Sequence, residues 1–203
     1  MLNNLEKRIV SISYEQGLSH IGSCLTAVNI IDEIYKIKKP NEKFVLSCGH
    51  AHLAHLVVRE KYESYKIGKI HDIHCNKKDG CDVSTGSLGM GLPIAVGMAL
   101  ADRKKNVYCL ISDGECAEGS IHEALRIIKE NKISNLKIYV NCNGYGAYRQ
   151  IDYFETKFAL GMEYGIPDIN IRMTEFPKWS FVTDPQEYHY KVLSKEEYEK
   201  ITR

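Results

Sequence analysis

Two short apolar runs and the amphipathic segment between them form the most regular pattern in this sequence. The run from Val107 to Ile111 predicts a buried strand, and the run from Leu136 to Val140 predicts a second one. The segment between them carries apolar residues at helical spacing: Ile121, Ala124, Leu125 and Ile128. The pattern therefore predicts a β-α-β unit, whose parallel strands end on the same edge of an α/β sheet.

Further helical patterns and one more short apolar run precede this unit. Helices are expected over residues 5–15, 51–62 and 92–100, and a strand over residues 44–46. Thr26 is expected to cap another helix, which the basic run ending at Pro40 would terminate. Residues 18–23 and 70–80 are polar and predict loops.

Composition and charge fit one globular domain. The chain has 203 residues, of which 44% are hydrophobic and 26% charged. A formal net charge of +1 gives no electrostatic case for nucleic-acid or membrane binding. No signal peptide is apparent, and no apolar run approaches the length of a membrane span. Seven cysteines without C-x-x-C pairs indicate reduced thiols, so we expect a cytoplasmic protein.

One group of potential metal ligands suggests a different chemistry. A zinc site could be built from His71, His74, Cys75 and Cys81. Their spacing matches no closed structural zinc site, which normally shows tighter ligand pairs, so we do not favour this interpretation.

Polar side chains follow both strands of the β-α-β unit. Asp113 offers a carboxylate and Asn143 an amide oxygen, which are hard donors suited to Mg²⁺ or Ca²⁺. Two such side chains and a backbone carbonyl near Tyr145 would leave room on the ion for a diphosphate. The alternative is that Asp and Asn are ordinary turn residues at these places.

The order of these residues resembles the thiamine diphosphate fingerprint, and in detail that of the transketolase family. Ser112-Asp113-Gly114 corresponds to the family's G-D-G, and Asn143 to its metal-binding asparagine. The resemblance implies Asp113, Asn143 and the Tyr145 carbonyl as Mg²⁺ ligands. It also implies cofactor contacts at Gly114, Glu115 and Asn143. Glu118 and Glu123 match two acidic residues that lie between paired active sites in the family. The resemblance gives Glu118 a catalytic role.

Three further segments resemble the same family. Ser19-His20-Ile21-Gly22 is similar to S-G-H-P-G, and Ser47-Cys48-Gly49-His50 matches S-x-G-H. Residues 83–91 resemble V-[ST]-T-G-[PS]-L-G-[QM]-G, which implies cofactor contacts at Gly86 and Leu88. The resemblance makes His20, His50 and His74 the catalytic histidines beside the reactive carbon, with His50 also contacting the cofactor. The segment beginning at Tyr188 resembles the usual close of the domain, which directs attention to His189.

The resemblance covers roughly residues 5–146 and implies a three-layer, doubly wound, mostly parallel α/β fold. We expect residues 1–203 to form one diphosphate-binding domain, shortened after about residue 146, with no room for a second α/β domain. This implies the diphosphate-binding subunit of a split transketolase-like enzyme, which uses thiamine diphosphate and Mg²⁺ to move a two-carbon ketol unit between sugars or sugar phosphates. The pyrimidine-binding and C-terminal domains would come from a partner subunit, in a heterotetramer. A non-catalytic cofactor-binding module, a nucleotide-binding α/β domain and a subunit of another thiamine diphosphate enzyme stay open as alternatives.

Overall fold

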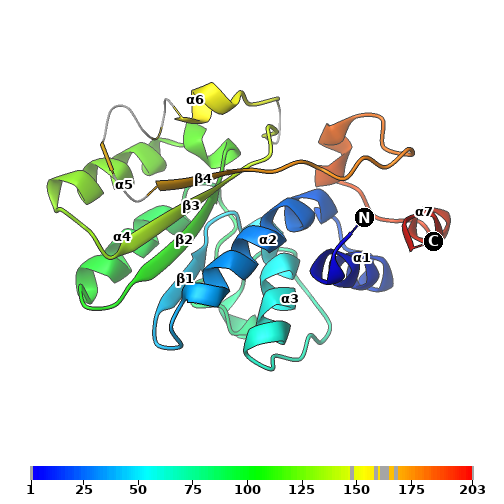
Figure 1. Ribbon diagram of the computed structural model, residues 1–203, viewed down its shortest axis with the longest axis horizontal. Helices are drawn as coiled ribbons and strands as arrows, with labels where there is room; N and C mark the ends of the chain where they lie inside the picture. Colours follow the sequence, from blue (N-terminus) through cyan, green and yellow to red (C-terminus); the bar gives the residue numbers. More distant parts are fainter. Residues whose placement is uncertain (1, 147–148, 158–159, 161–164, 167–168, 203) are drawn as a thin grey trace.

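Four parallel strands form the middle layer of the computed structural model, which describes residues 2–146, 149–157, 160, 165–166 and 169–202 (Figure 1). The strands lie in the order β1-β2-β3-β4. Their bounds are Lys43–Leu46, Val107–Ser112, Leu136–Cys142 and Ile169–Met173. Because every neighbouring pair is parallel, the carboxyl ends of the strands meet at one edge of the sheet.

Helices α2 (Ile21–Ile37) and α3 (His52–Tyr62) cover one face of the sheet, and α1 (Asn4–Gln16) packs on both of these helices. Phe44 and Leu110 point into this layer and belong to its apolar cluster. Leu46 lies in the same cluster, so alternate residues of β1 pack on this face.

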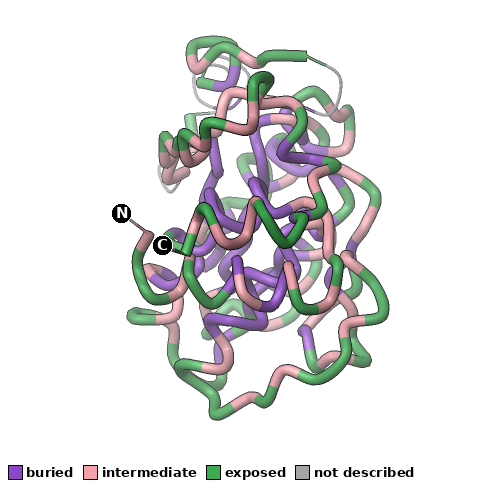
Figure 2. Tube along the Cα trace, turned by 90° about the vertical axis from the view of Figure 1, so that its right-hand side faces the viewer, coloured by how far each residue is buried: buried purple, intermediate pink, exposed green. Residues whose placement is uncertain are grey.

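Helices α4 (Gly91–Ala101) and α5 (Gly119–Glu130) cover the other face. Val45, Cys109 and Ile111 point into a second apolar cluster on this side. Since both faces of the sheet are covered, β1, β2 and β3 are buried along most of their length. Figure 2 shows the buried residues gathered in the interior of the molecule. The predicted three-layer α/β fold is thus confirmed. Among the described residues, no helix combines the length and apolar character needed to cross a bilayer.

The start of α2 differs from the prediction. Thr26 does not cap this helix but lies within it, and its hydroxyl donates to the carbonyl oxygen of Ser23 at 3.3 Å. The helix begins at Ile21, after His20 in the left-handed conformation (φ 61°). A Cβ atom at Gly22 would lie 2.4 Å from Cβ of Tyr188, so tertiary packing fixes a start that the local sequence does not mark.

The sequence pattern also missed β4, which pairs with β3 in parallel from Ile138 and Ile169 onwards. This strand is only half-buried and therefore lacks a continuous apolar run. Beyond it, the 3-10 helix Pro185–His189 packs beside α2, and α7 (Lys195–Thr202) packs on α1. The last two helical elements of the described chain thus pack on its first two helices.

Candidate functional site

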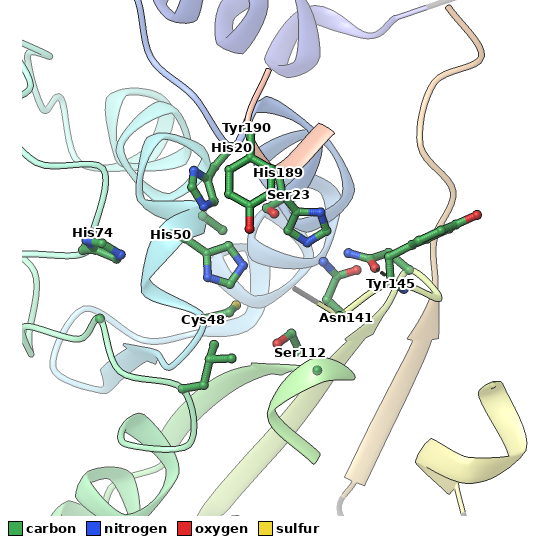
Figure 3. Close-up of a pocket in the computed structure, with 16 residues that line it drawn as sticks. His20, Ser23, Cys48, His50, His74, Ser112, Asn141, Tyr145, His189 and Tyr190 are labelled. Carbon is green, nitrogen blue, oxygen red and sulfur yellow. Dashed lines mark hydrogen bonds between the residues drawn. The ribbon is translucent and has the colours of Figure 1, made fainter. Parts of the chain in front are cut away.

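A cavity of about 180 Å³ lies beside the carboxyl ends of β2 and β3, and we call it the strand-end cavity (Figure 3). Most of the residues singled out in the sequence line it: His20, His50, His74, Gly86, Leu88, Gly114, Asn143 and Tyr145. They come from segments far apart in the chain that the sheet and its flanking loops bring together. The cavity is therefore the candidate cofactor site.

Asp113, at the end of β2, does not line the strand-end cavity but a smaller neighbouring one, and Leu88, Gly114 and Gly146 line both. The Asp113 carboxylate accepts hydrogen bonds from the backbone N–H groups of Gly114 at 2.9 Å and Gly144 at 2.7 Å. The residue is only 1% exposed, and burial raises the pKa of the carboxyl group to about 6, against the opposing effect of these donors. A buried carboxyl group with such a pKa gains from a cation that could replace its proton.

Asn143 follows β3 on the same edge of the sheet. Its Oδ1 atom accepts a hydrogen bond from the backbone N–H of Tyr145 at 3.0 Å. Gly144 has a φ of 82°, which turns the chain so that its N–H reaches Asp113. An amide oxygen has a second lone pair, so Asn143 keeps one acceptor position for an ion. Asp113 and Asn143 thus form an oxygen-donor set whose chemistry fits Mg²⁺.

Three histidine rings gather at the other side of the strand-end cavity, as Figure 3 shows. The ring centroids of His20 and His50 are 5.6 Å apart, and those of His20 and His189 are 6.5 Å apart. Burial, followed by the neighbouring histidines, lowers the pKa of His50 to about 3 and the pKa of His20 to about 4. Both imidazoles are therefore neutral near pH 7 and can each donate and accept one hydrogen bond.

His74 stands apart from these rings, on the loop between α3 and α4. Its Nδ1 atom lies 2.9 Å from Oδ1 of Asp72, an interaction that orients the ring. Gly86 lies next to it, since a Cβ atom there would be 3.5 Å from the His74 ring. The two residues therefore form one wall of the cavity.

Two unpaired polar atoms point to Ser23, which the motifs missed, and to His189. Among the described residues, the buried side-chain atoms without a hydrogen-bond partner are Ser23 Oγ and His189 Nδ1, and both residues line the strand-end cavity. Such atoms are costly unless a ligand or water satisfies them, so they indicate a binding surface. Ser23 follows the S-H-I-G segment by one residue, and His189 was singled out only by the resemblance of the C-terminal segment.

Glu115 does not line the cavity. Its carboxylate is fully buried and accepts hydrogen bonds from Ser47 Oγ at 2.6 Å, Gly89 N at 2.8 Å and Ser112 N at 3.0 Å. It therefore joins the loop after β1, the glycine-rich loop and the end of β2. This geometry gives Glu115 a positioning role, and its predicted contact with the cofactor is left without support.

Glu118 and Glu123 lie at the start and on the exposed side of α5, away from the cavity lining. Glu118 packs against the glycine-rich loop, where a Cβ atom at Gly89 would come 2.7 Å from Cβ of Glu118. Their roles in catalysis and at a contact with a partner stay predictions.

The four residues weighed as zinc ligands do not come together as a set. His71 is exposed, and His74 is held by Asp72 at the cavity wall. Cys75 and Cys81 instead turn inward, where Cys81 contacts two histidines of α3 that the sequence did not connect with them. This set, which the sequence analysis did not favour, is not assembled, because residue spacing in a loop does not show which helix lies beneath it.

Comparison with known proteins identifies the family. Residues 67–198 match the family described as thiamine pyrophosphate enzyme, C-terminal TPP binding domain. The chain is 33% identical over 169 residues to the transketolase of Homo sapiens, a match that covers 71% of this chain and 27% of that protein. It is 34% identical over 161 residues to one of the subunits of the apulose-4-phosphate transketolase of Phocaeicola vulgatus, a match that covers 68% of this chain and 57% of that protein. The chain thus spans about a quarter of the first relative and just over half of the second.

Solved structures agree on the fold. The transketolase of Campylobacter jejuni superposes with a TM-score of 0.70 at 18% sequence identity, over 96% of this chain and 40% of that one. The transketolase of Leishmania mexicana gives a TM-score of 0.58 at 16% identity, over 87% of this chain and 37% of that one. The chain belongs to the transketolase family and has the fold of its thiamine pyrophosphate-binding domain.

Proposed function

We propose that this chain is the diphosphate-binding subunit of a split transketolase, which transfers a two-carbon ketol unit between sugars or sugar phosphates together with a partner subunit. The observation that carries this proposal is the meeting of the β2 and β3 ends beside half-buried, neutral histidines. Asn143, His20 and His50 line the strand-end cavity, and the carboxylate of Asp113 at the end of β2 is joined to the β3 end by the N–H of Gly144. The similarity to a protein whose name makes it one subunit of a transketolase supports a divided enzyme.

Asp113, Asn143 and the carbonyl oxygen of Tyr145 would hold a Mg²⁺ or Ca²⁺ ion. Mg²⁺ takes about six oxygen ligands, so three from the protein leave positions for diphosphate oxygens and water. The buried Asp113 carboxylate, which is already turned toward the β3 end by the Gly144 N–H, is the strongest fit to such an ion. The backbone at Gly86 and Gly114 and the side chain of Leu88 would contact the cofactor from the cavity wall.

When bound, thiamine diphosphate supplies the carbanion chemistry of ketol transfer. The chain's own part is to orient the substrate and handle protons. His20 and His50 are neutral near pH 7, so each can donate a hydrogen bond to a sugar hydroxyl and accept one in turn. Ser23 and His189 offer further polar atoms that have no partner within the described part of the chain.

The test is ketol transfer by the purified chain with thiamine diphosphate and Mg²⁺, alone and mixed with the subunit that copurifies with it. We expect no transfer by the isolated chain and transfer by the reconstituted pair. Robust activity of the isolated chain would contradict the divided enzyme. Inactivity of the pair despite Mg²⁺-dependent cofactor binding would favour a non-catalytic binding module.

Calorimetry then separates cofactor classes. We expect Mg²⁺-dependent binding of thiamine diphosphate and no binding of a nicotinamide dinucleotide. Binding of the dinucleotide alone would favour a nucleotide-binding domain.

A further inference from the structure

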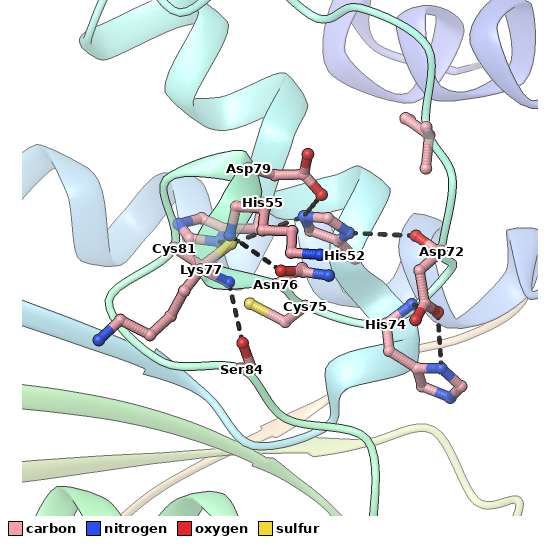
Figure 4. Close-up of polar contacts among 12 residues, drawn as sticks. His52, His55, Asp72, His74, Cys75, Asn76, Lys77, Asp79, Cys81 and Ser84 are labelled. Carbon is pink, nitrogen blue, oxygen red and sulfur yellow. Dashed lines mark hydrogen bonds and ion pairs between the residues drawn. The ribbon is translucent and has the colours of Figure 1, made fainter.

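Two histidines of α3 and two cysteines of the following loop lie together in the core (Figure 4). His52, Cys75 and Cys81 form a group at metal-ligand spacing, and His55 contacts Cys81. His52 and His55 lie one helical turn apart on α3, and Cys75 and Cys81 flank the 3-10 turn Lys77–Asp79 of the following loop. All four are buried, with exposed fractions of 0%, 2%, 3% and 5%. We call them the histidine–cysteine cluster.

The ligand atoms lie at the spacing of a metal site. One ligand atom each from His52, Cys75 and Cys81 lies within 4.8 Å of the others. Sγ of Cys81 is 3.6 Å from Nε2 of His52 and 3.5 Å from Nδ1 of His55. A tetrahedral zinc ion with Zn–S bonds of about 2.3 Å and Zn–N bonds of about 2.0–2.1 Å requires S···N edges of about 3.6 Å. Two edges of such a tetrahedron are therefore already formed.

The other nitrogen of each ring is oriented from outside the cluster. Nε2 of His55 lies 2.7 Å from the hydroxyl oxygen of Tyr35, and Nδ1 of His52 lies 3.5 Å from the carbonyl oxygen of Asp72. Histidine ligands of metals almost always have such a partner on the second nitrogen, because it fixes the tautomer and the ring orientation.

Charge balance selects the ion. Two thiolates and two neutral imidazoles around a divalent cation give a neutral group, which can be buried without an unpaired charge. Thiolate and imidazole ligands in a closed, four-coordinate arrangement suit zinc, whereas Mg²⁺ and Ca²⁺ require oxygen. The cluster thus differs in ligand chemistry from the oxygen donors at the end of β2.

We propose that His52, His55, Cys75 and Cys81 bind a structural Zn²⁺ ion that fastens the loop between α3 and α4 to α3. Cys81, Cys75 and His52 form the preassembled face, and His55 closes the fourth position. Binding releases the two thiol protons to solvent, and no atom changes its oxidation state.

The site would act on the strand-end cavity through the backbone. Cys75 directly follows His74, and its N–H donates to the carbonyl oxygen of Gly49 at 2.9 Å, next to His50. The N–H of Thr85, which precedes Gly86, donates to the carbonyl oxygen of Cys75 at 3.0 Å. An ion bound to Cys75 would therefore hold in place the two loop segments that line the cavity, one at His74 and the other at Gly86.

The first test is the metal content of the whole chain, purified without a metal-affinity tag, by inductively coupled plasma mass spectrometry. We expect about one zinc per chain, and at least about a tenfold loss in Cys75→Ser and Cys81→Ser. The matched control is Cys109→Ala, a buried cysteine on the opposite face of the sheet, which should keep its zinc. Zinc that survives in both serine variants would overturn the proposal.

The second test needs no variant. The chain is stripped with a chelator under reducing conditions and titrated with Co²⁺, whose visible and charge-transfer absorption reports tetrahedral geometry and thiolate ligands. We expect stoichiometric binding with thiolate-to-cobalt charge transfer and displacement by Zn²⁺. A folded, fully reduced chain that takes up neither ion, or a Cys75–Cys81 disulfide in the freshly purified protein, would overturn the proposal.

Discussion

The strand-end cavity and the histidine–cysteine cluster lie on either side of the same short stretch, residues 49–55. They differ in whether their buried polar atoms have hydrogen-bond partners within the protein. In the cavity, Ser23 Oγ and His189 Nδ1 have no hydrogen-bond partner among the residues that the structure describes, and burial lowers the pKa values of His20 and His50. In the cluster, the imidazoles contact a thiol on one side and a Tyr or carbonyl oxygen on the other. A surface that must exchange ligands keeps unpaired polar atoms, whereas a permanent structural site satisfies them from within.

Glu115 is a buried carboxylate whose hydrogen-bond donors are fixed by the fold. Its removal should lower the free energy of unfolding more than any other substitution considered below. Glu115→Ala leaves Ser47 Oγ and the N–H groups of Gly89 and Ser112 buried without an acceptor. We expect the free energy of unfolding to fall by about 4 kcal/mol, measured by urea denaturation.

The control is Glu123→Ala on the exposed side of α5, which should change stability by less than about 0.5 kcal/mol. Equal stability of the two variants would mean that Glu115 does not hold the loops, and its predicted contact with the cofactor would regain support.

Asp113→Ala tests the cofactor site at the cavity, and its expected effect on cofactor binding is the second largest. Removal of a ligand should weaken Mg²⁺-dependent binding of thiamine diphosphate about hundredfold, as measured by calorimetry. The zinc content should not change, because the carboxylate belongs to the other site. Asp102→Ala, an exposed aspartate at the end of α4, is the control and should bind the cofactor normally. Unchanged affinity in Asp113→Ala would rule out this metal site.

Sequence alone predicted the cavity better than the cluster for a physical reason. Asp113 and Asn143 follow neighbouring strands, and the parallel arrangement of strands brings their ends together whatever the rest of the chain does. The glycine-rich segment lies in the loop between α3 and α4 and was identified by the resemblance of its motif. Cys81 reaches His52 and His55 only because the loop folds back over α3, which no local pattern encodes. Two further features were missed because tertiary packing and not local sequence determines them. Strand β4 is only half-buried, and the start of α2 is set by packing of Gly22 on Tyr188.

Tyr35→Phe tests whether His55 is a zinc ligand by removing one hydroxyl group outside the proposed ligand set. The variant keeps the ring in its packing with Phe44 but removes the hydroxyl group that orients His55. We expect zinc affinity to fall about tenfold in a chelator competition, with little effect on cofactor binding. Tyr14→Phe, whose ring stacks on Tyr198, is the control and should bind zinc normally. Full zinc affinity in Tyr35→Phe would remove His55 from the ligand set.

The smallest expected effect is a pH dependence that belongs to the cavity alone. The pKa of His20 is lowered from 6.5 to about 4 by burial and by His189 and His74, and the rings of His50 and Tyr190 also face it. A histidine that is harder to protonate in the folded chain stabilises it fully above about pH 6.5 and loses that contribution as the pH falls toward 4. Since His20 is partly exposed, the loss between pH 7 and pH 5 should be about 1 kcal/mol.

Asp113 acts in the opposite sense, because its raised pKa favours folding as the pH falls through about 6, so total stability is a poor readout. The difference between wild type and His20→Asn isolates the histidine, and asparagine tolerates the left-handed backbone at this position. Denaturation of both proteins at pH 7 and pH 5 should show a smaller loss in the variant. An identical loss would mean that the pKa of His20 is not lowered in the folded chain, and that the cavity does not hold this imidazole in its neutral form.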